Sequence, residues 1–345
     1  MPLISVIIPV FNGAKTIRDT IASVLAQSFS EFELLIINDG STDDTLAVVS
    51  SFDDPRIQVF SYPNAGSNPS RNRGIDHARG EYISFIDADD LWTPDKLAAQ
   101  RQALQAQPQA AVAYSWTDCI DEQGQYLRQG AHATIAGNVL ANFLLTDCIG
   151  SGSNVLVRKS ALVEVGKFDE SLANAQDWDM WLRLAARYPF ACVPKVQVLY
   201  RVSAGSLSSN VQRMATASFR VIERSFAQAP ATLQHLKPHS LGNRYKFLTF
   251  RSLQGNPTRQ KGVLALQYLW NAVRYDPTLL RTRLLWKVLL AIAVMGLLPT
   301  AQAQALIARR QRLFNLYGLL ARMHLDPSRF APSIEPLPSA VSEPS

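Results

Sequence analysis

The sequence predicts an α/β fold, with a mainly parallel sheet flanked by helices and a helical C-terminal extension. Short apolar runs alternate with amphipathic segments over the first hundred residues, which is the rhythm of βαβ units. After about residue 211 no convincing strand pattern occurs, and helical periodicity takes over. The charge divides there too: residues 1–212 carry 16 Lys/Arg against 23 Asp/Glu, whereas 213–345 carry 18 against 5. The two parts are therefore expected to have different roles.

The first part of the chain alternates strand and helix patterns. Ile4–Val10 is a continuous apolar run, as expected for a strand that is covered on both faces. Segment Ala14–Gln27 has a helical pattern with its apolar residues on one side. Further strands are predicted at Leu34–Ile37, Ile57–Phe60 and Tyr82–Ile86, and a short helix at Pro69–Ala78.

Beyond Trp92 the alternation is looser. A helix is predicted at Pro94–Gln107, with Thr93 as its N-cap and proline at its first position. Strands are also predicted at 110–115, 154–157 and 196–200, and helices at 177–188, 211–228, 243–254, 259–275, 279–297 and 301–323. A tail rich in Pro and Ser follows. We predict three regions: an α/β domain over 1–210, a basic helical region over 211–326 and a disordered tail over 327–345.

Cysteine usage and the N-terminus favour a cytoplasmic location. The three cysteines are scattered without metal spacing, which fits a reducing compartment rather than a disulfide framework. The start, MPLISVIIPV, lacks a basic region and a cleavage site, so it is interpreted as a strand and not as a signal peptide. The net charge of +6 comes with no recognised nucleic-acid motif and few aromatics between the basic residues. We therefore predict no nucleic-acid partner.

Three polar clusters fall where predicted strands end. They are PVFNG at 9–13, NDGSTDD at 38–44 and DADD at 87–90. In an open α/β sheet, ligands bind beyond the carboxyl ends of the strands. The convergence of the three clusters therefore predicts a ligand site at that edge of the sheet.

The DADD cluster indicates a divalent cation. Three carboxylates lie within four residues, at Asp87, Asp89 and Asp90, and like charges this close repel. A hard cation relieves the repulsion, and Mg²⁺ or Mn²⁺ commonly uses one or two carboxylates together with substrate phosphates. The alternative is helix capping, because Asp89 or Asp90 could lead into the helix near Pro94.

Four motifs in order carry a family resemblance: SVIIPVFNGAKTIRDTIASVLAQSF, ELLIINDGSTDDT, RNRGIDHARGEYISFIDADD and FDESLANAQDWDMWLRLA. Together they resemble the family-2 glycosyltransferases, which have the GT-A fold, over about residues 3–205. The resemblance implies an inverting, metal-dependent enzyme that uses Mn²⁺ or Mg²⁺. Such an enzyme moves a sugar from a nucleoside-diphosphate sugar to an acceptor hydroxyl, as in polysaccharide, lipopolysaccharide or glycolipid synthesis.

The resemblance places the nucleotide at the first strand ends. Pro9, Phe11 and Asp39 match the positions that hold the base, and Asp39 favours a uracil- or thymine-type base, hence a UDP- or dTDP-sugar. Arg71 matches an arginine near the donor phosphates, a task that suits a guanidinium. Arg73 ranks lower, as a solvated charge. The alternatives are core packing for Phe11 and an Asx-turn before Gly40 for Asp39.

The resemblance also assigns the metal and the general base. Asp87 lies in the ribose or metal region and Asp89 ligates the metal directly. Asp177 matches the general base of inverting members, although Gln176 replaces the usual glutamate before it. The alternative for Asp177 is capping of its helix.

Two further features concern the acceptor side. Trp178 and Trp181 share a helical face, either lining the acceptor site or packing in the core. Arg201 lacks the histidine that often follows it in the family's closing segment, so a role that needs this histidine is in doubt.

The C-terminal part contains the most apolar stretch, LLWKVLLAIAVMGLL at 284–298. It is 15 residues long and interrupted by Lys287, so it is marginal for a membrane span of about 20 apolar residues. Basic residues on both sides favour peripheral contact with an anionic membrane, such as the inner face of the plasma membrane. The alternative is an ordinary buried helix. A saccharide or lipid-linked acceptor is consistent with either.

Two other functions remain open from the residues alone. A sugar nucleotidyltransferase would share the sheet and the acidic metal site, but its Gly-rich basic loop is not matched by FNGAKTIRD. A non-catalytic nucleotide-sugar-binding protein is left open by Gln176.

Overall fold

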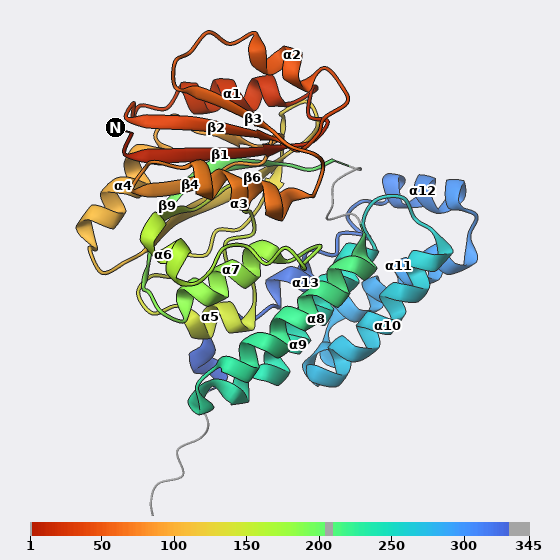
Figure 1. Ribbon diagram of the computed structural model, residues 1–345. Coiled ribbons are helices and arrows are strands. Elements are labelled where there is room, and N and C mark those ends of the chain that lie inside the picture. The colour runs from red at the N-terminus through yellow and green to blue at the C-terminus, as the bar shows by residue number, and fades with distance from the viewer. Residues whose placement is uncertain (1, 204–209, 331–345) are drawn as a thin grey trace, which may run out of the picture.

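The computed structural model describes residues 2–203 and 210–330. Its strands form one nine-stranded sheet in the order β3-β2-β1-β4-β8-β6-β9-β5, with β7 beside β6 (Figure 1). The strands are β1 Ile4–Val10, β2 Phe32–Asn38, β3 Ile57–Ser61, β4 Tyr82–Phe85, β5 Leu91–Trp92, β6 Val112–Ile120, β7 Tyr126–Gln129, β8 Leu156–Arg158 and β9 Phe190–Arg201. The sequence did not predict β5 or β7.

The predicted α/β class with a mainly parallel sheet is confirmed. Strands β3, β2, β1 and β4 are parallel to one another, as is the longest pair, β6 with β9. The antiparallel contacts all involve the short strands β5, β7 or β8. Strand β2 is buried along its whole length and β1 at all but one residue, as expected for a parallel sheet covered by helices on both faces.

The strand register brings the three polar clusters together. Val10 at the end of β1 lies opposite Asn38 at the end of β2. On the other side of β1, Ile7 lies opposite Phe85 at the end of β4. The segments that follow these strand ends therefore meet at one edge of the sheet, as the sequence predicts.

In the part of the chain that the structure describes, seven helices pack around this sheet. They are α1 Ile17–Leu25, α2 Thr45–Ser50, α3 Ser67–His77, α4 Lys96–Ala106, α5 Leu140–Leu145, α6 Lys159–Glu164 and α7 Gln176–Ala185. The predicted N-cap of α4 is wrong: the helix begins at Lys96, and the Thr93 hydroxyl bonds the Asp95 carboxylate at 2.8 Å instead.

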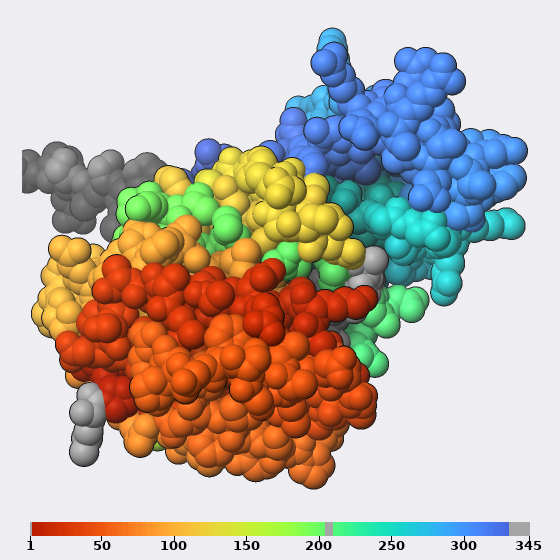
Figure 2. Space-filling model, turned by 90° about the horizontal axis from the view of Figure 1, so that it is seen from above, coloured from red at the N-terminus to blue at the C-terminus, as the bar shows by residue number. Residues whose placement is uncertain are grey.

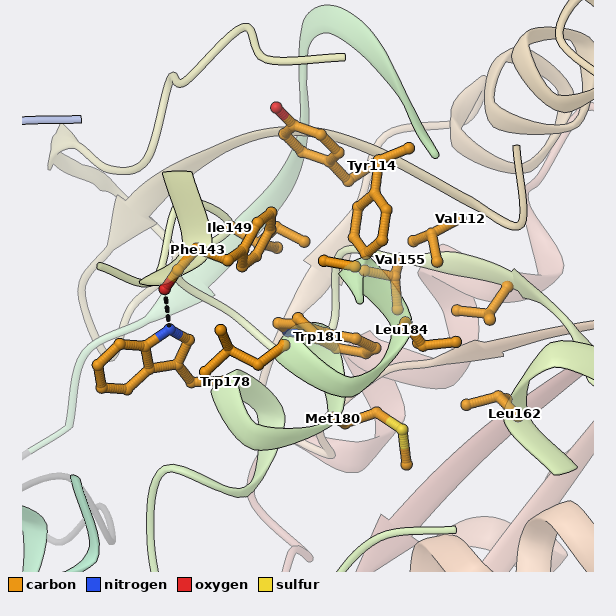
Figure 3. Close-up of a cluster of buried hydrophobic side chains, with 14 of the residues drawn as sticks. Val112, Tyr114, Phe143, Ile149, Val155, Leu162, Trp178, Met180, Trp181 and Leu184 are labelled. Atoms are coloured by element: carbon orange, nitrogen blue, oxygen red, sulfur yellow. Dashed lines mark hydrogen bonds between the residues drawn. The ribbon is translucent and has the colours of Figure 1, made fainter. Parts of the chain in front are cut away.

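The core between α7 and the sheet is aromatic. Trp181 is fully buried and Trp178 nearly so, and Trp178 Nε1 donates to the Phe143 carbonyl at 2.9 Å. Figure 3 shows both indoles packed among the side chains of β6, α5 and α7. The core-packing alternative is therefore correct for the two tryptophans, and they anchor the helix that carries Asp177.

The C-terminal part is helical, and no strand follows Arg201 in the part of the chain that the structure describes. Its helices are α8 Val211–Gln228, η2 Ala231–Leu236, α9 Lys237–Ser252, α10 Arg259–Tyr275, η3 Pro277–Arg281, α11 Arg283–Leu297, α12 Thr300–Arg309, α13 Gly318–Ala321 and η4 Pro327–Phe330. Among the described helices, none combines the length and the apolar character that crossing a bilayer requires. That 211–326 forms a separate domain stays a prediction.

The predicted disordered tail begins too early. Pro327–Phe330 forms η4, and the Phe330 ring stacks on His239 with centroids 3.7 Å apart. Residues 331–345, the rest of the predicted tail, lie outside the described residues.

The helical extension lies to one side of the N-terminal α/β part (Figure 2), and polar contacts join the two. Arg224 of α8 pairs with Asp169 at 2.8 Å and with Asp179 of α7. Asn243 of α9 donates to the carbonyl of Leu145 at 3.2 Å. The helix that carries Asp177 is therefore held from the extension as well as from the sheet.

Candidate active site

The loops after β1 and β2 are joined by hydrogen bonds. Asn12 has a positive φ of 52°, and its Oδ1 accepts from Thr42 N at 2.8 Å. Gly13 N donates to Thr45 Oγ1 at 2.8 Å. Phe11, next to them, is 52% exposed. The core-packing alternative for Phe11 is therefore wrong, and its ring is free to meet a ligand.

Asp39 is buried at the end of β2 and organises the loop before α3. One carboxylate oxygen accepts from Ala65 N at 2.9 Å and the other from Gly66 N at 2.8 Å. These bonds reach far along the chain, so they are not an Asx-turn at Gly40. Pro9 lies near the end of β1, opposite Ile37 and two residues before Phe11.

Arg73 lies at this edge of the site, although the sequence ranked it as a solvated charge. Its Nη1 is 3.4 Å from Asp39 Oδ1, and its guanidinium lies 4.4 Å from the centroid of the Tyr62 ring. The signal that could have found it is the tyrosine in the loop before α3, because arginine stacks well on aromatic faces.

Arg71 is buried and bridges two acids. Its Nη2 donates to Asp87 Oδ1 at 2.5 Å, and its Nη1 lies 3.9 Å from Asp177 Oδ1. Burial opposes its charge, but Asp87 and Asp177 outweigh this and raise the pKa of Arg71. Its Nη1 and Nε have no hydrogen-bond partner among the described residues. The guanidinium is therefore charged and only partly bonded.

Asp177 lies in the first turn of α7, with its side chain 23% exposed. The capping alternative is wrong, because the N-terminus of α7 has no side-chain cap. Burial, together with the charge of Asp87, raises the pKa of Asp177 to about 6, against the opposing effect of Arg71. A Cβ at Gly152 would lie 2.9 Å from this carboxylate, so the loop approaches Asp177 as closely as a glycine allows.

The polar atoms around Asp177 lack partners. Asp177 Oδ1 and Gln176 Oε1 are buried without a hydrogen bond, as are Ser70 Oγ and Asn68 Oδ1 on α3, within the described chain. Most buried polar atoms in native proteins are bonded. The unbonded Asp177 Oδ1 lies 3.9 Å from the unbonded Arg71 Nη1, so a polar ligand between α3 and α7 would complete the hydrogen bonding of both.

Asp89 and Asp90 have separate environments. Asp90 is fully buried and accepts from Ser153 Oγ at 2.5 Å and from Arg201 N at 2.9 Å. It therefore holds neighbouring segments together and does not cap α4. Burial and the charge of Asp87 raise the pKa of Asp89 to about 6.

Asp87 and Asp89 are the residues that could hold the divalent ion that the sequence predicts. No group of three or more His, Cys, Asp or Glu side chains forms a complete cage among the described residues. Mg²⁺ and Mn²⁺ need only one or two carboxylates when phosphate oxygens and waters fill the other positions. Burial is the larger cause of the raised pKa of Asp89 and the charge of Asp87 the second, and a cation would relieve the repulsion between these two carboxylates.

Arg201 supports this segment without the histidine that the sequence lacks. Its Nε donates to the Asp89 carbonyl at 2.8 Å, and its Nη1 donates to the Glu122 carbonyl at 2.9 Å. It thus fixes the backbone that presents Asp89, a role that does not need the missing histidine.

Arg244, on α9, places positive charge beside α7. Its guanidinium lies 5.6 Å from the centroid of the Trp178 ring, and its Nε is buried without a partner among the described residues. Burial lowers the pKa of Arg244 to about 10, so it remains a cation at neutral pH. No sequence signal pointed to Arg244, because only the packing of α9 brings it here.

The chain matches a family model and curated relatives. The model described as glycosyltransferase like family 2 matches residues 5–252. An uncharacterized glycosyltransferase of Rickettsia felis is 33% identical over 189 residues, covering 53% of this chain and 31% of that protein. The chondroitin synthase of Escherichia coli is 28% identical over 233 residues, covering 66% and 33%. The chain thus spans about a third of the length of these two relatives.

Solved structures have the same architecture. TarS 1–349 of S. aureus, in complex with UDP-GlcNAc, has a TM-score of 0.53 and 18% identity, covering 93% of this chain and 91% of that one. The mannosyltransferase PcManGT of Pyrobaculum calidifontis, in complex with GDP-Man and Mn²⁺, has a TM-score of 0.57 and 19% identity, covering 93% and 85%. These are GT-A structures, so the predicted GT-A fold is confirmed. Since the family model covers well over half of the sequence, the chain belongs to the glycosyltransferase like family 2.

Proposed function

We propose that the chain is an inverting, divalent-metal-dependent glycosyltransferase. It moves a sugar from a nucleoside-diphosphate sugar, with a UDP- or dTDP-sugar favoured, to an acceptor hydroxyl. The observation that carries the proposal is the placement of Arg71, which bonds Asp87 at 2.5 Å while lying 3.9 Å from Asp177. One buried cation thus links the acid of the donor side to the acid of the acceptor side.

On the donor side, Phe11 and Asp39 receive the base. The exposed Phe11 ring offers an apolar face against which a base can lie. The Asp39 oxygens already accept from Ala65 N and Gly66 N, but each carboxylate oxygen can accept more than one hydrogen bond. A ring N–H of uracil or thymine is therefore accommodated. Pro9 lines the end of β1 beside them.

The diphosphate lies between Arg71 and the acidic segment. Asp89, assisted by Asp87, would hold a Mn²⁺ or Mg²⁺ ion, which when bound supplies positive charge to the leaving diphosphate. The unbonded Nη1 and Nε of Arg71 are donors for phosphate oxygens. TarS binds UDP-GlcNAc and PcManGT binds GDP-Man with Mn²⁺, which supports a nucleotide-sugar donor for this chain. The nucleotide base of that donor is determined by the experiment below.

Asp177 acts as the general base. Its ionised carboxylate takes the proton of the acceptor hydroxyl as that oxygen forms a bond to the anomeric carbon. The bond from the anomeric carbon to the phosphate oxygen breaks at the opposite face, and the electron pair leaves with the nucleoside diphosphate. The configuration at the anomeric carbon is therefore inverted. The orphaned Asp177 Oδ1 is the free acceptor that this step needs.

The acceptor is a saccharide or a lipid-linked molecule, and the pathway is polysaccharide, lipopolysaccharide or glycolipid synthesis. The basic helical extension supports a cytoplasmic enzyme at the inner face of the plasma membrane. The chondroitin synthase relative is consistent with polysaccharide synthesis.

The proposal is tested by donor binding and turnover. Wild-type protein is screened by thermal denaturation with nucleoside diphosphates and their sugars, with and without Mn²⁺. Specific binding raises the melting temperature by mass action. We expect the correct donor to stabilise the wild type more strongly with Mn²⁺ than without it, and Asp89→Asn to lose the Mn²⁺-dependent part. Full activity of Asp89→Asn would refute the metal assignment.

Product analysis separates the other functions. Transfer of the sugar to an acceptor, with release of a nucleoside diphosphate, supports the proposal. Release of pyrophosphate from a nucleoside triphosphate would indicate a nucleotidyltransferase instead. Donor binding without turnover across a broad acceptor panel would indicate a non-catalytic binding protein.

A further inference from the structure

Helix α10 exposes an apolar stripe. Val263, Leu266 and Trp270 are 52%, 49% and 71% exposed, and their i, i+3, i+7 spacing places them on one side of the helix. The opposite side is buried, with Ala265 and Leu269 packed in the core of the extension. The stripe is therefore a second apolar face, which no described part of the chain covers.

Helix α11 has the same two-sided character. Val288 and Ile292 pack in the core of the extension. Trp286, Leu290 and Leu297 are 72%, 40% and 83% exposed, and their i, i+4, i+11 spacing places them on one side. The sequence offered a buried helix and a membrane-facing helix as alternatives for this segment; the buried alternative describes one face of α11, and the other face is exposed.

The two stripes adjoin. Figure 1 shows α10 and α11 side by side on the part of the extension away from the sheet. A Cβ at Gly262 of α10 would lie 3.3 Å from Met295 Cβ and 3.5 Å from the Ile292 carbonyl of α11, so the helices cross closely there. Helical-wheel positions counted from this line of contact put both stripes on the same side of the pair.

The tryptophans concentrate on this surface. Of the six in the chain, Trp92, Trp178 and Trp181 are at most 4% exposed, whereas Trp270 and Trp286 are 71% and 72% exposed. Exposing an indole to water is unfavourable, but its amphipathic ring suits the boundary between water and lipid. Two such rings on adjacent helices indicate an interface rather than scattered surface apolar residues.

The charge around the stripes has one sign. Residues 259–325 contain ten Lys/Arg and a single acidic residue, Asp276. That acid is already engaged, since Asp276 Oδ2 lies 2.7 Å from the buried Lys246 Nζ. Arg274 on α10, Arg281 on η3 and Arg283 on α11 are exposed. The complementary partner is therefore anionic.

We propose that the exposed face of α10 and α11 docks on the surface of an anionic lipid bilayer, with Trp270, Trp286 and Leu297 entering the headgroup boundary. The surrounding arginines bind the lipid phosphates. A second copy of the chain fits less well, because a two-fold contact of this face with itself would bring two basic surfaces together. The proposal goes beyond sugar transfer and does not require it.

Vesicle binding tests the proposal on the full chain. Wild-type protein is sedimented with phosphatidylcholine vesicles that contain or lack phosphatidylglycerol, at low and high salt. We expect binding only to the anionic vesicles, weakened by salt, with a blue shift of tryptophan emission as Trp270 and Trp286 leave water. Equal binding to neutral vesicles, or no binding at all, would overturn the proposal.

Matched variants locate the surface. Arg281→Glu with Arg283→Glu should weaken vesicle binding by about tenfold or more, since each basic residue near an anionic surface is worth about 1 kcal/mol. Arg213→Glu with Arg220→Glu, exposed on α8, is the charge-matched control and should bind like the wild type. Trp270→Ser with Trp286→Ser should lose both binding and the blue shift, whereas Val163→Ser, 56% exposed on α6, should not.

Melting temperatures and oligomeric state complete the test. Near-wild-type melting of each variant shows that lost binding is not lost folding. The alternative outcome is that the wild type self-associates and does not bind vesicles, and that the double variant Trp270→Ser, Trp286→Ser no longer self-associates. In that case the face would be a contact between copies, and the lipid proposal would be wrong.

Discussion

Two buried cations differ in how completely their neighbours bond them: Lys246 in the extension and Arg71 in the α/β part. Lys246 Nζ lies 2.7 Å from Asp276 Oδ2 and donates to the Arg322 carbonyl at 2.8 Å. The other oxygen of Asp276 accepts from Thr278 N at 3.2 Å. Arg71 has one hydrogen bond, to Asp87, and its Nη1 and Nε have none among the described residues.

The difference separates a structural ion pair from a binding site. A buried charge whose neighbours satisfy it holds segments in place and has no capacity left for a ligand. A buried charge with unbonded donors next to unbonded acceptors keeps that capacity. The contrast predicts that changes near Arg71 affect chemistry more than folding, and that changes at Lys246 do the reverse.

The largest expected effect is on catalysis, from Asp177→Asn. The amide cannot take the acceptor proton, so kcat should fall by about 10³-fold, within the range for loss of a general base. The melting temperature should not fall, because burial already disfavours the charged form of Asp177 and raises its pKa to about 6. Initial rates with the identified donor and thermal denaturation measure the two effects.

Asp179→Asn is the matched control on the same helix. Asp179 is 2% exposed and pairs with Arg183 at 2.9 Å and with Arg224. The substitution removes the carboxylate charge that pairs with both arginines, so the free energy of unfolding should fall. The kcat of the folded enzyme should stay near the wild-type value. A kcat within tenfold of wild type for Asp177→Asn would contradict the general-base role.

The next effect is on stability, from Lys246→Met. It leaves Asp276 partly buried without its cation, and breaking a buried pair typically costs about 3–5 kcal/mol of unfolding free energy. The kcat of the remaining folded protein should be unchanged. Urea denaturation measures the loss, and adding Asp276→Asn should recover part of it. If the double variant were as unstable as the sum of the single ones, the pair would not be coupled.

The smallest expected effect is a shift of the pH–rate profile. With the pKa of Asp177 at about 6, the ionised base is lost as the pH falls through that value, so the rate should decline on the acid side. Arg71 lowers the pKa of Asp177; Arg71→Gln should therefore move the acid limb to higher pH. Arg71→Lys keeps the charge and should move it less. An unmoved limb in Arg71→Gln would show that another group controls it.

Local sequence patterns were enough to predict most of the fold. The apolar runs Ile4–Val10 and Tyr82–Ile86 predicted strands that the structure contains at the same residues, except that the second ends one residue earlier. Such runs are informative because a strand in a parallel sheet must bury both faces. The polar clusters at the strand ends followed from the same logic. Strand β7 was missed because it pairs only with β6 at the edge and is largely exposed, so it has no apolar signature.

Contacts distant in sequence could not be predicted in this way. Trp178 and Trp181 share a helical face whether they line a pocket or a core, and only the packing of α7 against α5 and β6 shows them buried. Large separations along the chain have the same consequence: Arg201 N donates to the Asp90 carboxylate across 111 positions. No local pattern contains that information.

The sequence by itself determined the α/β class, the basic helical extension and the motifs that identify candidate donor, metal and base residues. Periodicity and residue chemistry suffice for these, because each depends on neighbours along the chain. The tertiary structure alone decided that Arg71 lies between Asp87 and Asp177, that Asp90 ties neighbouring segments together and that Trp270 and Trp286 are exposed. Burial and charge pairing depend on which segments the fold brings together. The partners of a segment lie far away in the sequence, so the segment's own residues do not identify them.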